Sequence, residues 1–80
     1  MNLNRFFAIY PNPANSTVNI ESCHNENYGL IITDVTGGLF YKTSFSEKVT
    51  IPVTGWPAGF YYVQAVSESG YRCVQKLVVE

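Results

Sequence analysis

One stretch, residues 55–66, constrains the fold more than any other part of the chain. It opens with a turn, because Pro57 fixes its own φ and lacks an N–H, and Gly59 can adopt backbone conformations that a side chain disfavours. Residues 60–66 are then almost all aromatic or β-branched, which is typical of a strand in the middle of a sheet. Alternation predicts that three of them face the core: Tyr61, Val63 and Ala65.

Six further segments have strand composition, and turn residues separate them at intervals of about 8–12 residues. No window shows the apolar period of a helix. Pro52 near the end of one segment predicts an edge strand or a strand end. The sequence therefore predicts an all-β fold, a small immunoglobulin-like antiparallel β-sandwich of about seven strands. The six segments are residues 6–10, 17–21, 29–35, 39–45, 48–53 and 71–79.

The chain of 80 residues has room for one domain, which we place at residues 6–80. Residues 1–5 are polar, lack the apolar run of a secretory signal, and are expected to be a linker or a cloning remnant. The net charge of −1 and the absence of a basic cluster argue against nucleic acid as a partner. No apolar run reaches the roughly 18 residues of a transmembrane segment.

Catalytic or metal-binding residues are scarce. His24 is the one histidine, and a zinc site would need Cys23 and the distant Cys73 to join it. A solvated loop histidine is the simpler interpretation. The acidic residues are scattered over separate loops and strand ends, and no nucleophile elbow is present. We therefore expect no enzyme activity and no cofactor or metal.

Cys23 and Cys73 are compatible with a disulfide, which would close a long loop and add roughly 2–4 kcal/mol. The two cysteines follow or lie in strands that can belong to opposite sheets. We therefore favour the alternative, a buried free thiol.

Two further groups have a functional and a structural interpretation. Residues 34–38 could form a ligand loop, but Asp34 followed by Gly37 favours a tight turn in which the carboxylate binds local backbone. Trp56 could form a sugar-stacking platform with tyrosines of the strands, but core and cross-strand packing is the favoured interpretation. The tyrosines concerned are Tyr41, Tyr61, Tyr62 and Tyr71.

Four motifs occur in order: Tyr-Pro-Asn-Pro-Ala at 10–14, Ile-Thr-Asp-Val-Thr-Gly at 32–37, Trp-Pro-Ala-Gly-Phe-Tyr at 56–61 and Lys-Leu-Val-Val at 76–79. With this spacing the chain resembles, over about residues 7–80, the C-terminal sorting domain of proteins exported by the type IX secretion system of Bacteroidetes-lineage bacteria. Trp56 stands where leucine is more usual, Gly38 where a basic residue follows the glycine, and Glu80 ends a tail that is commonly more basic.

The resemblance implies that the domain is an address and not a catalyst. Such domains end a larger cargo protein, pass with it through the periplasm, and direct it across an outer-membrane translocon to the cell surface. A sortase-like cysteine peptidase then removes the domain and attaches the cargo to the surface. We expect that cleavage at or before Phe6. The identity of the cargo does not follow from these residues.

The resemblance also assigns residue roles. Translocon recognition is expected in the last strand and tail, at Lys76, Leu77, Val78, Val79 and Glu80. The other motif residues are expected to shape the fold: Pro11, Asn12, Pro13, Asp34, Gly37, Pro57, Ala58, Gly59 and Tyr61. The last strand is an exposed-edge candidate, which could pair with a translocon partner or form a homodimer.

The alternative is a small immunoglobulin- or fibronectin-like module that binds carbohydrate or protein. It requires Trp56 and two tyrosines to be coplanar and exposed to solvent, whereas the sorting interpretation lets them pack.

Overall fold

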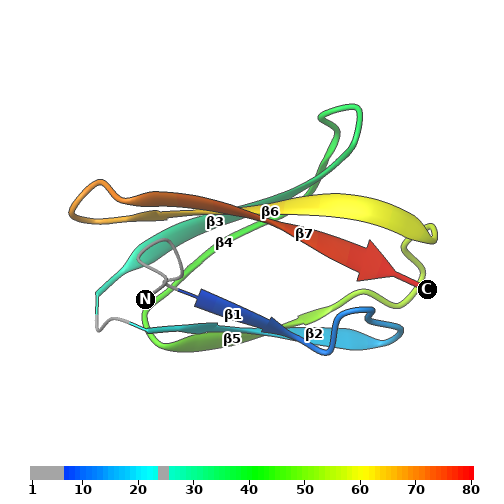
Figure 1. The fold of residues 1–80 in the computed structure, drawn as a ribbon, viewed down its shortest axis with the longest axis horizontal. Helices are drawn as coiled ribbons and strands as arrows, with labels where there is room; N and C mark the ends of the chain where they lie inside the picture. The colour runs from blue at the N-terminus through cyan, green and yellow to red at the C-terminus, as the bar shows by residue number, and fades with distance from the viewer. Residues whose placement is uncertain (1–6, 24–25) are drawn as a thin grey trace.

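In the computed structural model, which describes residues 7–23 and 26–80, seven strands form two facing antiparallel sheets (Figure 1). The three-stranded sheet has the order β1-β2-β5 and the four-stranded sheet the order β4-β3-β6-β7. This confirms the predicted immunoglobulin-like sandwich. The strands are β1 (Phe7–Tyr10), β2 (Thr17–Ser22), β3 (Tyr28–Asp34), β4 (Leu39–Phe45), β5 (Lys48–Pro52), β6 (Gly59–Ser67) and β7 (Arg72–Val79).

No helix occurs in the described ranges, and so none there is suited to crossing a membrane. The predicted strand limits differ from the observed ones by a residue at several ends; Val35, for example, lies in the turn after β3. Phe6, the first residue of the first predicted strand, lies outside the described residues, as do residues 1–5 and the predicted cleavage point.

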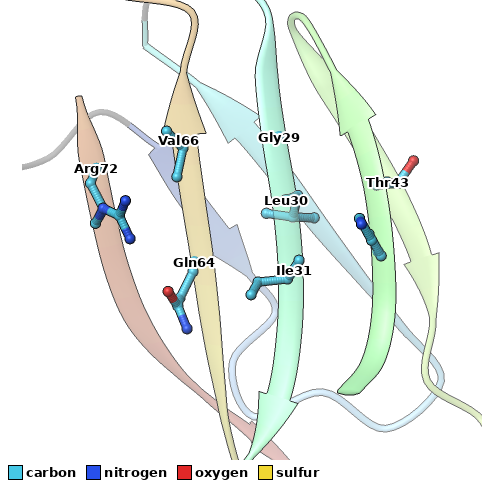
Figure 2. Close-up of a pocket in the computed structure, with 8 residues that line it drawn as sticks. Gly29, Leu30, Ile31, Thr43, Gln64, Val66 and Arg72 are labelled. Carbon is cyan, nitrogen blue, oxygen red and sulfur yellow. The ribbon is translucent and has the colours of Figure 1, made fainter. Parts of the chain in front are cut away.

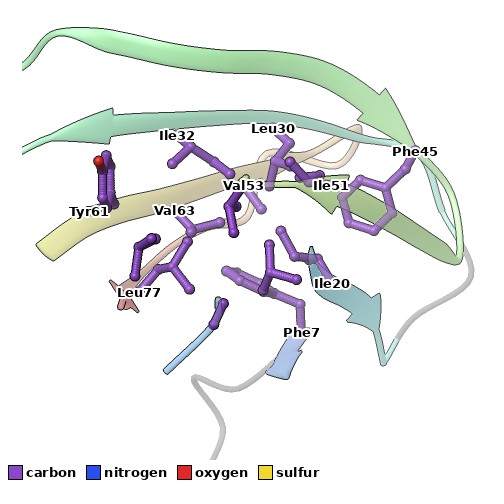
Figure 3. Close-up of a cluster of buried hydrophobic side chains, with 14 of the residues drawn as sticks. Phe7, Ile20, Leu30, Ile32, Phe45, Ile51, Val53, Tyr61, Val63 and Leu77 are labelled. Atoms are coloured by element: carbon purple, nitrogen blue, oxygen red, sulfur yellow. The ribbon is translucent and has the colours of Figure 1, made fainter. Parts of the chain in front are cut away.

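The core forms because every second residue of a strand points between the sheets (Figure 3). In β6 the three residues predicted to face inward are all buried, and in β2 the two buried residues, Val18 and Ile20, alternate in the same way. Side chains of both sheets meet in one cluster, which extends to the last strand. Its members are Phe7, Ala14, Val18, Ile20, Tyr28, Leu30, Ile32, Phe45, Ile51, Val53, Tyr61, Val63, Ala65, Leu77 and Val79.

Strand positions follow composition. Strands β3 and β6, which are rich in aromatic and β-branched residues, are the inner strands of the four-stranded sheet and pair with each other from Tyr28 opposite Ser67 to Asp34 opposite Tyr61. Pro52 is the last residue of β5, which is an edge strand. This position suits proline, because proline has no N–H to donate to a neighbouring strand.

An aromatic cluster closes one end of the core. The ring centroids of Phe40, Trp56 and Tyr61 lie 5.0–5.3 Å apart, and the rings are tilted or edge-on. The hydroxyl of Tyr61 donates a hydrogen bond to the carbonyl oxygen of Pro57. Tyr61 therefore ties the strand that it belongs to back to the turn that precedes it.

Tyr61→Phe should lower the free energy of unfolding by about 1 kcal/mol, because it removes this hydrogen bond and leaves the ring in place. Tyr62→Phe is the matched control, since Tyr62 is the next residue and points away from the core. Urea unfolding of both variants measures the difference. Equal stabilities would contradict a structural role for the Tyr61 hydroxyl.

Candidate functional site

The four sequence motifs meet at one end of the sandwich, the right-hand end in Figure 1. We call this the motif end and define it as residues 11–14, 34–38, 56–61 and 76–80. Strand register brings the segments together: Asp34 pairs with Tyr61, Gly59 pairs with Val79, and Ala14 forms a parallel bridge with Val79. Segments up to 66 residues apart in the sequence therefore form one continuous surface.

The corner after β1 binds the outer edge of β7. Asn12 Nδ2 donates to the carbonyl oxygen of Lys76 at 3.0 Å, and Asn12 Oδ1 accepts from the Val78 N–H at 2.9 Å. The backbone of Ala14 continues this contact. Its N–H donates to the Val78 carbonyl oxygen, and its carbonyl oxygen accepts from the Glu80 N–H, both at 2.8 Å. Asn12 thus offers one donor and one acceptor, as a strand residue would.

This contact corrects the expectation that the last strand is an exposed edge along its whole length. β7 does lie at the edge of its sheet, but Asn12 and Ala14 bind four outward backbone groups of residues 76–80: the Lys76 carbonyl, the Val78 N–H and carbonyl, and the Glu80 N–H. Neighbouring residues of a strand point their backbone groups to opposite sides, so Arg72 and Val74 also point outward. No hydrogen bond to another segment is seen at those two residues, whereas the Gln75 side chain donates to the Phe7 carbonyl oxygen at 3.0 Å, so the open part of the edge comprises Arg72 and Val74.

The prolines on either side of Asn12 shape this corner. Both are exposed, and the Tyr10–Pro11 and Asn12–Pro13 peptide bonds are cis. Neither proline carries an N–H that would need a partner. Ala14, the next residue, is fully buried between the sheets, which anchors the corner in the core.

The predicted recognition residues divide into two sets. Leu77 and Val79 are buried in the core, while Lys76 and Glu80 are exposed and Val78 is half-buried. The ammonium group of Lys76 lies 4.9 Å from the ring centroid of Phe60, which is a cation–π contact. A partner at this end can therefore contact Lys76 and Glu80 directly, whereas Leu77 and Val79 act through the fold.

Asp34 organises the turn between β3 and β4. Its Oδ1 accepts hydrogen bonds from the Thr36 hydroxyl at 2.7 Å and from the amides of Thr36 and Gly38 at 2.9 and 2.8 Å. Gly37 has a φ of +93°, and a Cβ on Gly38 would lie 3.1 Å from Asp34 Oδ2. The positive φ favours glycine at position 37, and a side chain at position 38 would have to displace the Asp34 carboxylate slightly, so the tight-turn interpretation accounts for the motif.

The same hydrogen bonds shift the pKa of Asp34. The Thr36 hydroxyl makes the largest contribution and the Gly38 amide the next, and together they hold the pKa below its ordinary value of 3.8. Burial raises the pKa of Tyr61 above 10.0, with the negative charge of Asp34 as the second cause. At neutral pH Asp34 is ionised, and Tyr61 keeps the proton that it donates to Pro57.

A shallow, open hollow of about 200 Å³ lies between the Asp34 turn and the turn before β6. Asp34 and Val35 form one side, residues 57–61 form the other, and Phe40 completes the lining. Gly59 in its wall has a φ of +148°, a backbone conformation in which a side chain would be strained. Two of the four motifs therefore share one concave surface.

The aromatic residues do not form the platform that a sugar-binding module would need. Tyr61 is only 3% exposed, and the Trp56 and Tyr61 rings are inclined at 47°. Trp56 and Tyr41 pack against the core, as the favoured interpretation predicted. Tyr62 faces outward opposite Lys76, and Tyr71 is largely exposed, so the packing prediction is wrong for Tyr71.

The remaining candidates do not converge. His24 lies outside the described residues, and within the described ones no group of three or more potential metal ligands occurs. Cys23 and Cys73 are thiols in the structure; Cys23 is exposed and Cys73 is half-buried. The favoured alternative of a buried thiol is therefore wrong for Cys23.

Comparisons with known proteins agree with the fold and the motifs. A family model described as "Secretion system C-terminal sorting domain" matches residues 8–80. A search of curated proteins finds no match. Among solved structures, the chain is similar to a DUF3244 family protein with an immunoglobulin-like β-sandwich fold from Bacteroides vulgatus. The identity is 16% and the TM-score 0.78, over 92% of this chain and 83% of that one, which shows a shared fold.

Asn12→Ala should release the tail from the corner, because it removes both side-chain hydrogen bonds to β7. We expect a loss of about 1 kcal/mol in the free energy of unfolding and faster hydrogen exchange of the Val78 amide by about tenfold. Asn15→Ala is the matched control, since Asn15 is an exposed asparagine of the same corner. Unchanged exchange at Val78 in the Asn12 variant would refute the interlock.

Asp34→Asn should destabilise the chain at neutral pH and have less effect in acid. A folded-state pKa below 3.8 means that the carboxylate contributes its full stabilisation above that pH and loses it as the pH falls through the lower, folded value. Urea unfolding of the variant and the parent chain between about pH 2 and 7 measures the difference. Glu47→Gln is the control, and a difference independent of pH would contradict the assignment.

Proposed function

We propose that this chain acts as a sorting signal, because it belongs to the family of secretion system C-terminal sorting domains, the sorting signals of type IX secretion. The domain directs a cargo protein, joined to its N-terminal side, across the outer membrane and towards the cell surface or the extracellular space. The family match over residues 8–80 supports this proposal, and so does the position of all four motifs at one end of the sandwich.

The secretion machinery recognises the folded motif end and not a linear tail. Leu77 and Val79 are unavailable to a partner while the domain is folded, and the outward Lys76 carbonyl, both Val78 backbone groups and the Glu80 N–H already have partners. What remains accessible is Lys76 and Glu80 beside the Pro11–Pro13 corner. A translocon component that contacts these groups distinguishes a finished domain from an unfolded chain.

Removal of the domain fits the position of the first strand. A sortase-like cysteine peptidase that cuts at or before Phe6 would leave β1 to β7 intact, because β1 begins at Phe7. Transit through the periplasm, cleavage and attachment of the cargo to the surface are part of the proposal. The domain is the substrate and address in these steps and performs no reaction of its own.

Pairing through the edge of β7 is limited to its first half, because the Gln75 side chain already reaches across to the Phe7 carbonyl oxygen. A strand of the translocon or of a second copy of the chain would add there by backbone hydrogen bonds to Arg72 and Val74. The proposed homodimer is confined to that stretch.

Deletion of residues 77–80 from a reporter cargo that carries this chain at its C-terminus should trap the cargo in the periplasm of a type IX-secreting host. The deletion removes Leu77 and Val79 from the core, so a second variant separates recognition from folding. Lys76→Glu with Glu80→Lys keeps the core and should reduce surface delivery severalfold. Lys48→Glu, on the outer face of the other sheet, is the control.

Cell fractionation and surface proteolysis measure delivery. Normal surface delivery of the deletion variant would refute the sorting function. Normal delivery of the charge variant alone would place recognition on other residues of the motif end.

A further inference from the structure

The two outer faces of the sandwich have different chemistry. On the three-stranded sheet, outward residues are mostly polar and bond to one another: the Tyr10 hydroxyl donates to Glu21 and the Thr50 hydroxyl donates to Asn19, both at 2.8 Å. Glu21 is paired in register with Lys48, so the charges there balance. This is an ordinary solvated face.

The outer face of the four-stranded sheet is apolar and basic. We call it the basic–apolar face. The strand register places its cations on the two edge strands, with Lys42 on β4 and Arg72 and Lys76 on β7. None of these three forms an ion pair with another described residue, and none of the outward positions is acidic. Its apolar members are Ile31, Leu39, Phe60, Tyr62, Val66, Val74 and Val78.

A glycine on an inner strand, near one end of this face, has no backbone explanation. Gly29 lies within β3, opposite Ser44 on one side and Val66 on the other, in an uninterrupted part of the ladder. Its φ is not positive, and a Cβ built on it would meet nothing within 4 Å. A glycine inside a strand costs roughly 0.5–1 kcal/mol, and it often marks a place where another molecule approaches.

The missing side chain leaves a hollow of about 240 Å³ (Figure 2). Ile31 and Val66 lie beside it, and Lys42 and Arg72 lie on opposite flanks. The hollow is thus a small apolar depression between two cations whose charges are not neutralised by the protein itself.

We propose that the basic–apolar face docks an acidic segment of a partner protein, with an apolar side chain of that segment in the hollow over Gly29 and its carboxylates facing Lys42 and Arg72. Charge complementarity selects this occupant, because a second copy would bring three more cations to the same face. A concave hollow fits one side chain, whereas insertion into a bilayer needs apolar groups that protrude beyond the charges. The inference does not depend on the sorting function, since the hollow lies away from the tail.

The size of the face sets the expected affinity. Four strands spaced about 4.8 Å apart, with about six residues each, cover roughly 300 Å². A total burial well under about 1,200 Å² is typical of weak, transient complexes. Such a contact suits a partner that must release the domain.

The test is a titration of the isotope-labelled 80-residue chain with an end-blocked peptide that has one central phenylalanine and three acidic residues on each side. We expect chemical-shift changes at Gly29, Ile31 and Val66, with a dissociation constant of about 0.1–1 mM. Gly29→Tyr should fill the hollow and abolish binding. Because the space above Gly29 is open and tyrosine favours strands, the variant should melt at or above the parent temperature.

Lys42→Gln with Arg72→Gln should weaken binding by about tenfold, whereas Lys48→Gln, on the other face, should change it less than about twofold. A peptide with lysines in place of the acidic residues should not bind. Absent or dispersed shift changes, or full binding by a folded Gly29→Tyr variant, would overturn the proposal.

Two other occupants give distinct results. If vesicles containing phosphatidylglycerol bind the chain and the Lys42 and Arg72 variants abolish it, the face contacts a membrane and the proposal is wrong. If sedimentation shows dimers that Gly29→Tyr abolishes, the occupant is a second copy, and the proposal is equally wrong. If dimers form that Gly29→Tyr does not affect, and the chain still binds the peptide, then the dimer interface is the edge of β7. That result supports the proposal.

Discussion

The hydrogen bonds between the corner after β1 and the outer edge of β7 hold the motif end of this domain together. They join the two sheets at a point where each would otherwise end in an unpaired edge strand. An open edge invites pairing with other chains. Here Asn12 supplies the donor and acceptor of a missing strand residue, and the buried Ala14 fixes that residue against the core. The tail is therefore ordered by a segment at the opposite end of the sequence.

This constraint extends from the tail to the other motifs through strand register. Val79 pairs with Gly59, so the position of the tail and that of the turn before β6 are coupled. Tyr61, two residues further on, pairs with Asp34 and binds the carbonyl oxygen of Pro57. The motif residues consequently act through shape. The polar groups of Asn12, Asp34 and Tyr61 are engaged in hydrogen bonds within the motif end.

The sequence predicted what depends on local pattern. The alternation in β6, the central position of that strand and the strand end at Pro52 all follow from residue composition and periodicity and from the missing N–H of proline. It did not predict the contact of Asn12 with Lys76 and Val78, because 64–66 residues separate the partners. A proline-flanked asparagine gives no local sign of which edge it will bind.

The sequence predicted the candidate site only in part, again because contacts between distant segments leave no local sequence pattern. The resemblance selected the motif residues, but only the fold shows that Leu77 and Val79 are buried while Lys76 and Glu80 are exposed. The burial of Leu77 and Val79 is visible as alternation in the tail, and that signal could have separated the two sets. The exposure of Cys23 had no comparable pattern, because it follows a strand end.

Three glycines of this chain have a structural explanation, whereas Gly29 has none. Gly37 and Gly59 have positive φ, and Gly38 leaves room for the Asp34 carboxylate, so each has a reason in the backbone or its nearest neighbour. Gly29 has neither, although it occupies a strand position where almost any other residue would be more stable. Departures from local preference that bring no gain to the fold are expected at functional positions. The hollow over Gly29, between Lys42 and Arg72, is the consequence of that departure, and it makes one face of the sandwich suited to a partner and leaves the other to solvent.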